Sequence, residues 1–122
     1  MNNLNSEWRN LAPGLIRQRV VIECTTSKVV GMEEIKDYLV KLSDVLAMRP
    51  LSAPFAYPAE DMGYGGWIHW ITSGAHVYSY TTNPPLLTID AYTCKPFSVE
   101  KAVQFTQKYF DVQEIVWKEI DV

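Results

Sequence analysis

The sequence predicts an α+β protein, a two-layer sandwich in which a mainly antiparallel sheet carries helices on one face, in the order β-α-β-β-β-α-β. Segments with apolar residues spaced three and four apart, typical of helices, alternate with segments rich in β-branched and aromatic residues. Three consecutive strand-like runs, 64–72, 75–82 and 86–94, are separated by short turn-forming sequences, which favours antiparallel neighbours. Helices inserted among such strands pack on the sheet as a second layer.

The first half of the chain is predicted to hold a strand followed by a helix. The run Val20-Val21-Ile22 makes 15–26 typical of a strand that is buried on both faces. Gly31 precedes two glutamates, whose charges complement the dipole of a helix that begins there. Apolar residues recur at three and four positions along 31–48, and Pro50 ends this helix.

The second half contains the three central strands, a second helix and a last strand. Ser98 is a good N-cap for a helix over 98–110. Alternating residues over 112–122 predict the last strand. The segment 49–62 holds three prolines and predicts a rigid irregular loop, which either borders a functional site or is a packed surface crossover.

Composition describes a single soluble domain. The chain has 122 residues, of which 48% are hydrophobic and 20% charged. The formal net charge is −3 without a basic block, which disfavours binding to nucleic acid. No apolar run approaches the ~20 residues that span a bilayer, and the first residues lack the features of a signal peptide. Polar residues 1–13 predict a loose arm before one domain over 14–122.

The cysteines and histidines indicate a reducing compartment and no metal. Cys24 and Cys94, without an export signal, predict a cytoplasmic protein with two free thiols; a disulfide between them is the alternative. No Cys or His pair has the spacing of metal ligands, so no metal is expected. His69 stands between Trp67 and Trp70 in a strand, which favours a hydrogen-bonded core histidine.

The stretch from residue 73 to residue 94 is the most informative part of the sequence. Taken alone, Ser73-Gly74 is a tight turn and Cys94 a small buried apolar residue. However, Ser73-Gly74-Ala75-His76-Val77-Tyr78-Ser79-Tyr80 and Asp90-Ala91-Tyr92-Thr93-Cys94 resemble two motifs of the small prokaryotic S-adenosylmethionine decarboxylases, Ser-His-x-x-x-His-Thr-Trp and Asp-x-x-Thr-Cys. The resemblance covers 64–94 and extends more weakly into both flanks.

The resemblance implies an enzyme that makes its own cofactor by cutting its chain. The Ser73 hydroxyl would attack the carbonyl of Thr72, the backbone would break between these residues, and a pyruvoyl group would remain at position 73. The pyruvoyl ketone condenses with the substrate amine and accepts the electrons released as carbon dioxide leaves. Cys94 would then protonate the carbanion. The implied reaction is decarboxylation of S-adenosylmethionine, or of a related amino acid, for polyamine (spermidine) synthesis.

The remaining candidate site residues also follow from this resemblance and from position. Tyr78 takes the place of a family histidine that helps to remove a proton during processing, and His76 near the turn is expected to serve the site. Tyr64, Trp67 and Asp90 are expected to bind the substrate, the aromatic rings by stacking and cation–π contact. Because family members pair as dimers, a homodimer is expected.

Three differences from the family motif keep a second function open. Thr72 replaces an acidic residue, Gly74 replaces a histidine, and Tyr78 replaces the histidine base. A phenol with a pKa of about 10 is a poorer base at neutral pH than an imidazole with a pKa of about 6.5. The alternative is an unprocessed, catalytically inactive homologue that binds a small cationic ligand or a partner subunit.

Overall fold

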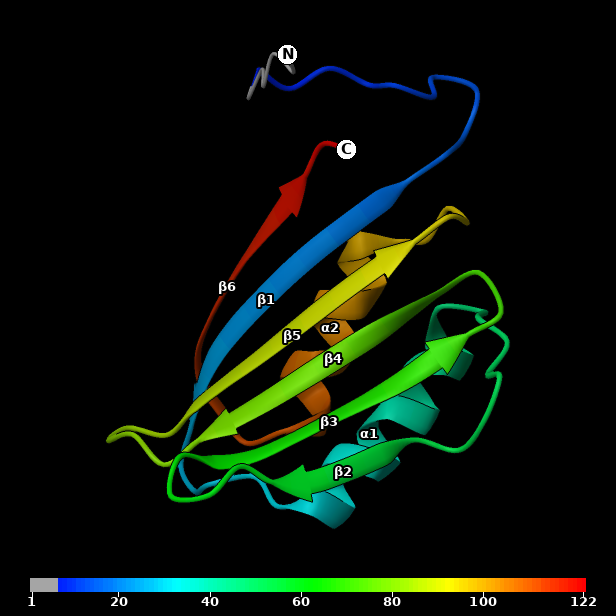
Figure 1. Ribbon diagram of the computed structural model, residues 1–122. Helices are drawn as coiled ribbons and strands as arrows, with labels where there is room; N and C mark the ends of the chain where they lie inside the picture. The colour runs from blue at the N-terminus through cyan, green and yellow to red at the C-terminus, as the bar shows by residue number, and fades with distance from the viewer. Residues whose placement is uncertain (1–6) are drawn as a thin grey trace, which may run out of the picture.

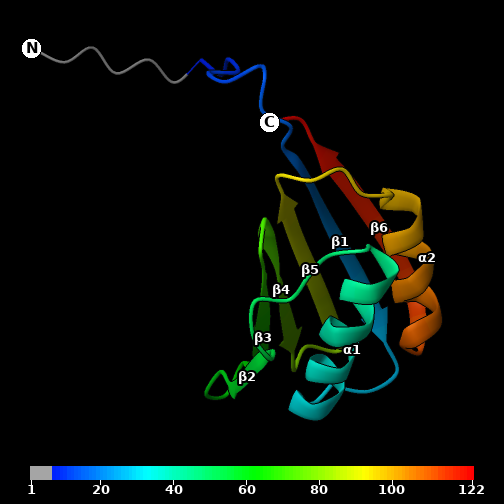
Figure 2. The ribbon, with the colours of Figure 1, turned by 90° about the vertical axis from the view of Figure 1, so that its right-hand side faces the viewer.

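The computed structural model describes residues 7–122, which form one antiparallel sheet with two helices packed on one of its faces (Figures 1 and 2). The elements in chain order are β1 (Gln18–Thr26), α1 (Met32–Val45), β2 (Phe55–Pro58), β3 (Gly63–Trp70), β4 (Ser73–Tyr80), β5 (Leu86–Thr93), α2 (Val99–Tyr109) and β6 (Val112–Ile120). The strands lie in the order β2-β3-β4-β5-β1-β6, and all neighbours are antiparallel. The predicted α+β sandwich is confirmed.

One short strand adds to the predicted order. Strand β2 pairs with β3 from Phe55 opposite Trp67 to Pro58 opposite Tyr64, inside the segment for which the sequence predicts an irregular loop. The large rings of Phe55 and Tyr57 alternate around a small alanine, a strand pattern that the surrounding prolines obscure. Because proline cannot donate to a ladder, β2 stays at the edge of the sheet and ends at a proline.

The hydrophobic core lies between the sheet and the helices. Helix α1 directs Ile35, Tyr38 and Leu39 toward the sheet, and all three side chains are fully buried. Alternate residues of the strands meet them from below, as the two-residue period of a strand requires. These strand residues include Val20, Ile22, Ile68, Val77, Leu87 and Ile89. The prediction that the first strand is buried on both faces is wrong, because Glu23 of β1 is exposed on the other face.

The two helices begin as predicted and contact each other through a hydrogen bond between buried side chains. Ser98 caps α2, since its hydroxyl accepts a hydrogen bond from the Lys101 backbone N–H at 3.2 Å. Helix α1 starts after Gly31 with two glutamates in its first turn. Between the helices, the buried Tyr38 hydroxyl lies 2.7 Å from the Thr106 hydroxyl. Within the described chain, neither helix is long and apolar enough to cross a membrane.

The hairpin between β3 and β4 turns at Ile71 and Thr72, two residues earlier than Ser73-Gly74, so the predicted position of the turn is wrong. Trp70 pairs with Ser73, so Ser73 is the first residue of β4. The register is held by the core, because Trp70 is 2% exposed and its indole N–H donates to the buried Ser43 hydroxyl at 2.8 Å. The turn therefore holds Ser73 at one end of the sheet.

Candidate functional site

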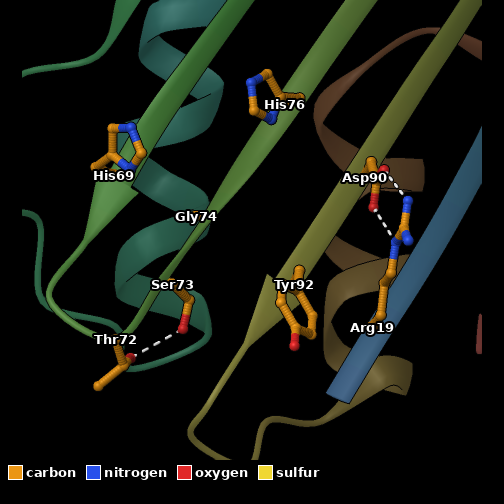
Figure 3. A pocket seen from close by; sticks show the side chains of 8 residues that line it. All are labelled: Arg19, His69, Thr72, Ser73, Gly74, His76, Asp90 and Tyr92. Atoms are coloured by element: carbon orange, nitrogen blue, oxygen red, sulfur yellow. Dashed lines mark hydrogen bonds and ion pairs between the residues drawn. The ribbon is translucent and has the colours of Figure 1, made fainter. Parts of the chain in front are cut away.

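A pocket of about 380 Å³ lies on the sheet face that the helices leave uncovered, at the end where β3 turns into β4 (Figure 3). Four neighbouring strands contribute to it, so it is assembled from residues far apart in the sequence. Its lining residues are Arg19, His69, Thr72, Ser73, Gly74, His76, Asp90 and Tyr92. The set includes a serine hydroxyl, two imidazoles, a carboxylate and a guanidinium, which together can bind a polar ligand and transfer protons.

Thr72 and Ser73 line the pocket where β4 begins, and the backbone of Cys94, which is not itself a lining residue, contacts both of them. The Cys94 backbone N–H donates to the Ser73 hydroxyl at 3.1 Å and to the Thr72 carbonyl oxygen at 3.3 Å. The Ser73 hydroxyl in turn donates to the Thr72 hydroxyl at 3.0 Å, as Figure 3 shows. Strand pairing explains the meeting, because Ser73 lies opposite Thr93, the residue before Cys94. Two residues twenty-one positions apart are thereby brought into contact.

The cysteines are both free, as predicted. Cys24 is buried in the core between the sheet and the helices, where desolvation raises the pKa of its thiol to about 11. Cys94 is exposed at the end of β5, so the simple expectation of a buried apolar cysteine is wrong for this residue. The Cys94 thiol is accessible on a residue whose backbone contacts Ser73, whereas the buried Cys24 thiol is held neutral.

An ion pair forms the opposite end of the pocket. Arg19 donates from Nε to one Asp90 carboxylate oxygen at 3.0 Å and from Nη2 to the other at 2.7 Å. Both side chains remain partly exposed, at 41% and 35%. The pair joins β1 to β5, and the hydrogen bonds to Asp90 raise the pKa of Arg19 further. Asp90 is therefore brought to the pocket as expected, but with both oxygens already occupied by a cation.

Two histidines line the side of the pocket formed by β3 and β4. His76 lies opposite Asp90 in the pairing of β4 with β5, so this expected site residue does reach the pocket. His69 lines it as well, and its exposed side chain corrects the interpretation of a core histidine. The error has a clear signal in the sequence: Ile68 and Trp70 face the core, so the residue between them must face outward.

Tyr78 lies outside the pocket lining, further along β4. Its ring stacks on His76 with a centroid separation of 6.1 Å, and Tyr80 continues the row at 6.5 Å. Desolvation, with smaller contributions from neighbouring acidic groups, raises the pKa of the Tyr78 phenol. Tyr78 follows Ser73 by five positions along β4, so the two backbone positions are roughly 17 Å apart at ~3.4 Å per residue. Its hydroxyl is therefore protonated at neutral pH and not in contact with the Ser73 hydroxyl.

The two other aromatic candidates lie on opposite faces of the sheet. Trp67 is on the uncovered face, with its ring 4.5 Å from that of His69 and 6.5 Å from that of His76. Tyr64 packs against the core on the helix side and does not line the pocket. Sequence reasoning missed Arg19 and Tyr92. These residues lie opposite each other because β1 pairs with β5, although the two strands are far apart in the sequence.

Two comparisons with known proteins give a match, one to a family model and one to a solved structure. Residues 21–121 match the family model of S-adenosylmethionine decarboxylase. The solved structure of the adenosylmethionine decarboxylase from Aquifex aeolicus superposes with a TM-score of 0.67 at 17% sequence identity, covering 87% of this chain and 89% of that chain. At this identity the superposition shows a shared fold. No curated protein matches the sequence significantly.

Proposed function

Because the chain belongs to the S-adenosylmethionine decarboxylase family, we propose that it cleaves its own backbone between Thr72 and Ser73 and serves as a pyruvoyl-dependent decarboxylase of S-adenosylmethionine, or of a related amino acid, in polyamine synthesis. One observation carries this proposal. A single backbone donor, the Cys94 N–H, contacts both the hydroxyl that would attack and the carbonyl oxygen that would receive the charge.

The first chemical step needs a nucleophile, an activated carbonyl and a stabilised oxyanion. The Ser73 oxygen forms a bond to the Thr72 carbonyl carbon, and the bond from that carbon to the Ser73 nitrogen breaks. The hydroxyl proton passes to that nitrogen, which gives an ester and a free amine on Ser73. Negative charge develops on the Thr72 oxygen during this step. The Cys94 N–H donates to that oxygen and supplies the kind of stabilisation that an oxyanion hole provides.

The second step requires a base. Removal of the Ser73 α-proton expels Thr72 as a carboxylate and leaves a dehydroalanine. One water then hydrolyses its imine tautomer, with release of ammonia and formation of the ketone. In the described chain the imidazoles of His69 and His76 line the pocket, whereas the protonated Tyr78 lies along the strand. A pocket histidine is therefore the proposed base.

Ser73 can form a pyruvoyl group, but the hydroxyl of Thr72 beside it predicts that the group forms slowly. The Ser73 proton is donated to the Thr72 hydroxyl, a far weaker acceptor than the carboxylate at this place in the family motif. Once formed, the group would supply an electron-accepting ketone for loss of carbon dioxide. The exposed Cys94 thiol is the proposed proton donor, because the backbone of this residue contacts Ser73. Trp67 and Asp90 are proposed to contribute to binding of the substrate.

Denaturing mass spectrometry tests cleavage directly. Fresh protein is expected to be mostly intact, and incubation is expected to produce fragments of 72 and 50 residues, the smaller blocked at its N-terminus. Ser73→Ala should abolish the fragments. Ser52→Ala, which changes an exposed serine outside the pocket, should leave their yield unchanged. Absence of the 50-residue fragment after prolonged incubation, or its appearance from Ser73→Ala, would refute the proposal.

A second function is favoured by the hydrogen bonding of Ser73. Its hydroxyl is used both as donor and as acceptor, which describes a structural serine equally well. In that case the protein is an unprocessed homologue that binds a small cationic ligand or a partner subunit. An intact chain whose melting temperature rises with S-adenosylmethionine, ornithine or arginine would establish ligand binding without cleavage.

We also propose that two copies associate through the uncovered sheet face. Strands β2 to β5 place a row of rings there, among them Phe55, Trp67 and Tyr78. The charge on this part of the face is balanced, because Asp90 is paired with Arg19. An aromatic, electrically neutral sheet face is suited to packing against its own copy. Light scattering should show that Phe55→Glu halves the mass of the particle; an unchanged mass would refute this interface.

A further inference from the structure

Strand β6 forms an unpaired edge of the sheet. Among the described residues it pairs with β1 alone, at the rim visible in Figure 1. Val116 and Trp117 are 55% and 54% exposed, although they point to opposite faces of the sheet. The other edge, β2, is four residues long and ends at a proline, so it offers little to a further strand. A nine-residue edge with exposed apolar side chains is able to accept another strand.

The sequence of β6 is complementary to itself when read in opposite directions. If two copies pair antiparallel with Val116 at the centre, Glu114 of each lies opposite Lys118 of the other. The same register sets Ile115 opposite Trp117. Opposite charges and apolar side chains facing each other across strands are favourable cross-strand pairs. Within the described chain, the recorded ion pairs leave Glu114 and Lys118 unpaired.

Neighbouring registers lack this complementarity. Moving the centre half a residue toward the C-terminus sets Glu114 opposite Glu119 twice. Moving it one residue toward the N-terminus sets Glu114 opposite Val116 and Lys118 opposite Val112, so neither charge faces an opposite charge. Like charges directly opposite each other destabilise a pairing. Of these three registers, the one centred on Val116 alone sets Glu114 opposite Lys118.

The favoured register also matches the two faces of the sheet. Val116 lies opposite Glu23, an exposed residue of the uncovered face, whereas Trp117 lies opposite the buried Ile22. Residues opposite each other in an antiparallel pair share a face, so the helices of both copies would stay on one side. There Trp117, which borders a hollow beside α2, would be covered by Ile115 of the second copy.

We propose that β6 pairs with β6 of a second copy, antiparallel and centred on Val116, to join two sheets into one continuous sheet. This edge is separate from the aromatic face proposed above to join two copies. The two contacts together would give a tetramer, and the edge contact alone a dimer. In either case, loss of the edge contact halves the mass of the particle.

Charge reversal tests this pairing, with light scattering over a series of protein concentrations as the readout. Lys118→Glu places the introduced glutamate of each copy opposite Glu114 of the other copy, and the repulsion at these two sites should halve the particle mass. Glu114→Lys should do the same with two lysines. The double variant Glu114→Lys/Lys118→Glu restores opposite charges and should recover the wild-type mass. An equimolar mixture of the two single variants should recover it as well, because each chain then complements the other.

The controls keep the outcome independent of chain cleavage and of folding. All variants carry Ser73→Ala, so the chain stays whole whether or not the wild type is processed. Lys101→Glu reverses an exposed charge on α2, away from the edge, and should leave the mass unchanged. Circular dichroism verifies that each variant is folded. A monomeric parent protein, an unchanged mass in Lys118→Glu, or a double variant that stays at half mass would each overturn the proposal.

Discussion

The bond between Trp70 and Ser43 is expected to stabilise the hairpin that carries Ser73, and Ser43→Ala tests it. Trp70 is 2% exposed, and its indole N–H donates to the Ser43 hydroxyl, which is 0% exposed, at 2.8 Å. Removal of that hydroxyl leaves a buried donor without a partner, at a cost of about 2 kcal/mol. For a chain of 122 residues, an unfolding entropy of roughly 0.26 kcal/mol/K converts this cost into a fall in Tm of about 8 °C.

A double-mutant cycle, with the free energy of unfolding measured in urea, separates the cost of leaving the Trp70 indole N–H without a partner from other effects of Ser43→Ala. Trp70→Phe removes the donor, so Ser43→Ala in that background should cost about 1 kcal/mol or less. What remains is mainly loss of the bond from the Ser43 hydroxyl to the Leu39 carbonyl. The exposed Ser52→Ala serves as the control and should change stability by less than ~0.5 kcal/mol. An equal cost of Ser43→Ala in both backgrounds would refute the reasoning.

Three further outcomes are expected. Thr72→Glu restores an acidic acceptor beside the Ser73 hydroxyl, and mass spectrometry should detect roughly tenfold faster cleavage or more; a rate no faster than that of the wild type would contradict the role assigned to position 72. The exposed Cys94 should react with a thiol reagent at neutral pH long before the buried Cys24, and equal rates would contradict their placement. Burial raises the pKa of Cys24 from 9.0 to about 11, so the folded state retains this proton more tightly than the unfolded chain. Stability should therefore be complete below about pH 9 and decline toward pH 11, and Cys24→Ala should weaken that decline in urea titrations.

Sequence reasoning recovered the elements whose signals are local. Ser98 caps a helix as its position indicates, and the order of strands and helices follows from hydrophobic periodicity. It missed β2 because prolines obscure the alternation of Phe55 and Tyr57. His69 was assigned to the core on account of the tryptophans around it, although the alternation of β3 directs it outward.

The candidate site was harder to predict, because it depends on pairing between distant segments. The motifs relate Ser73 to Cys94, but the contacts of the Cys94 N–H with the Ser73 hydroxyl and the Thr72 carbonyl follow from the register of β4 against β5. Arg19 and Asp90 are 71 residues apart, and no local sequence pattern predicts that β1 pairs with β5. Long-range register is set by how the core packs, which a single sequence does not display.

The two-residue turn at Ile71 and Thr72 has a consequence for the integrity of the fold. A nick there removes no rung from the ladder between β3 and β4, which runs from Gly63 opposite Tyr80 to Trp70 opposite Ser73. Both new ends would stay clamped in the sheet by neighbours on either side. Pieces 1–72 and 73–122, produced separately, should therefore be able to reassemble into the same architecture, as a split protein does.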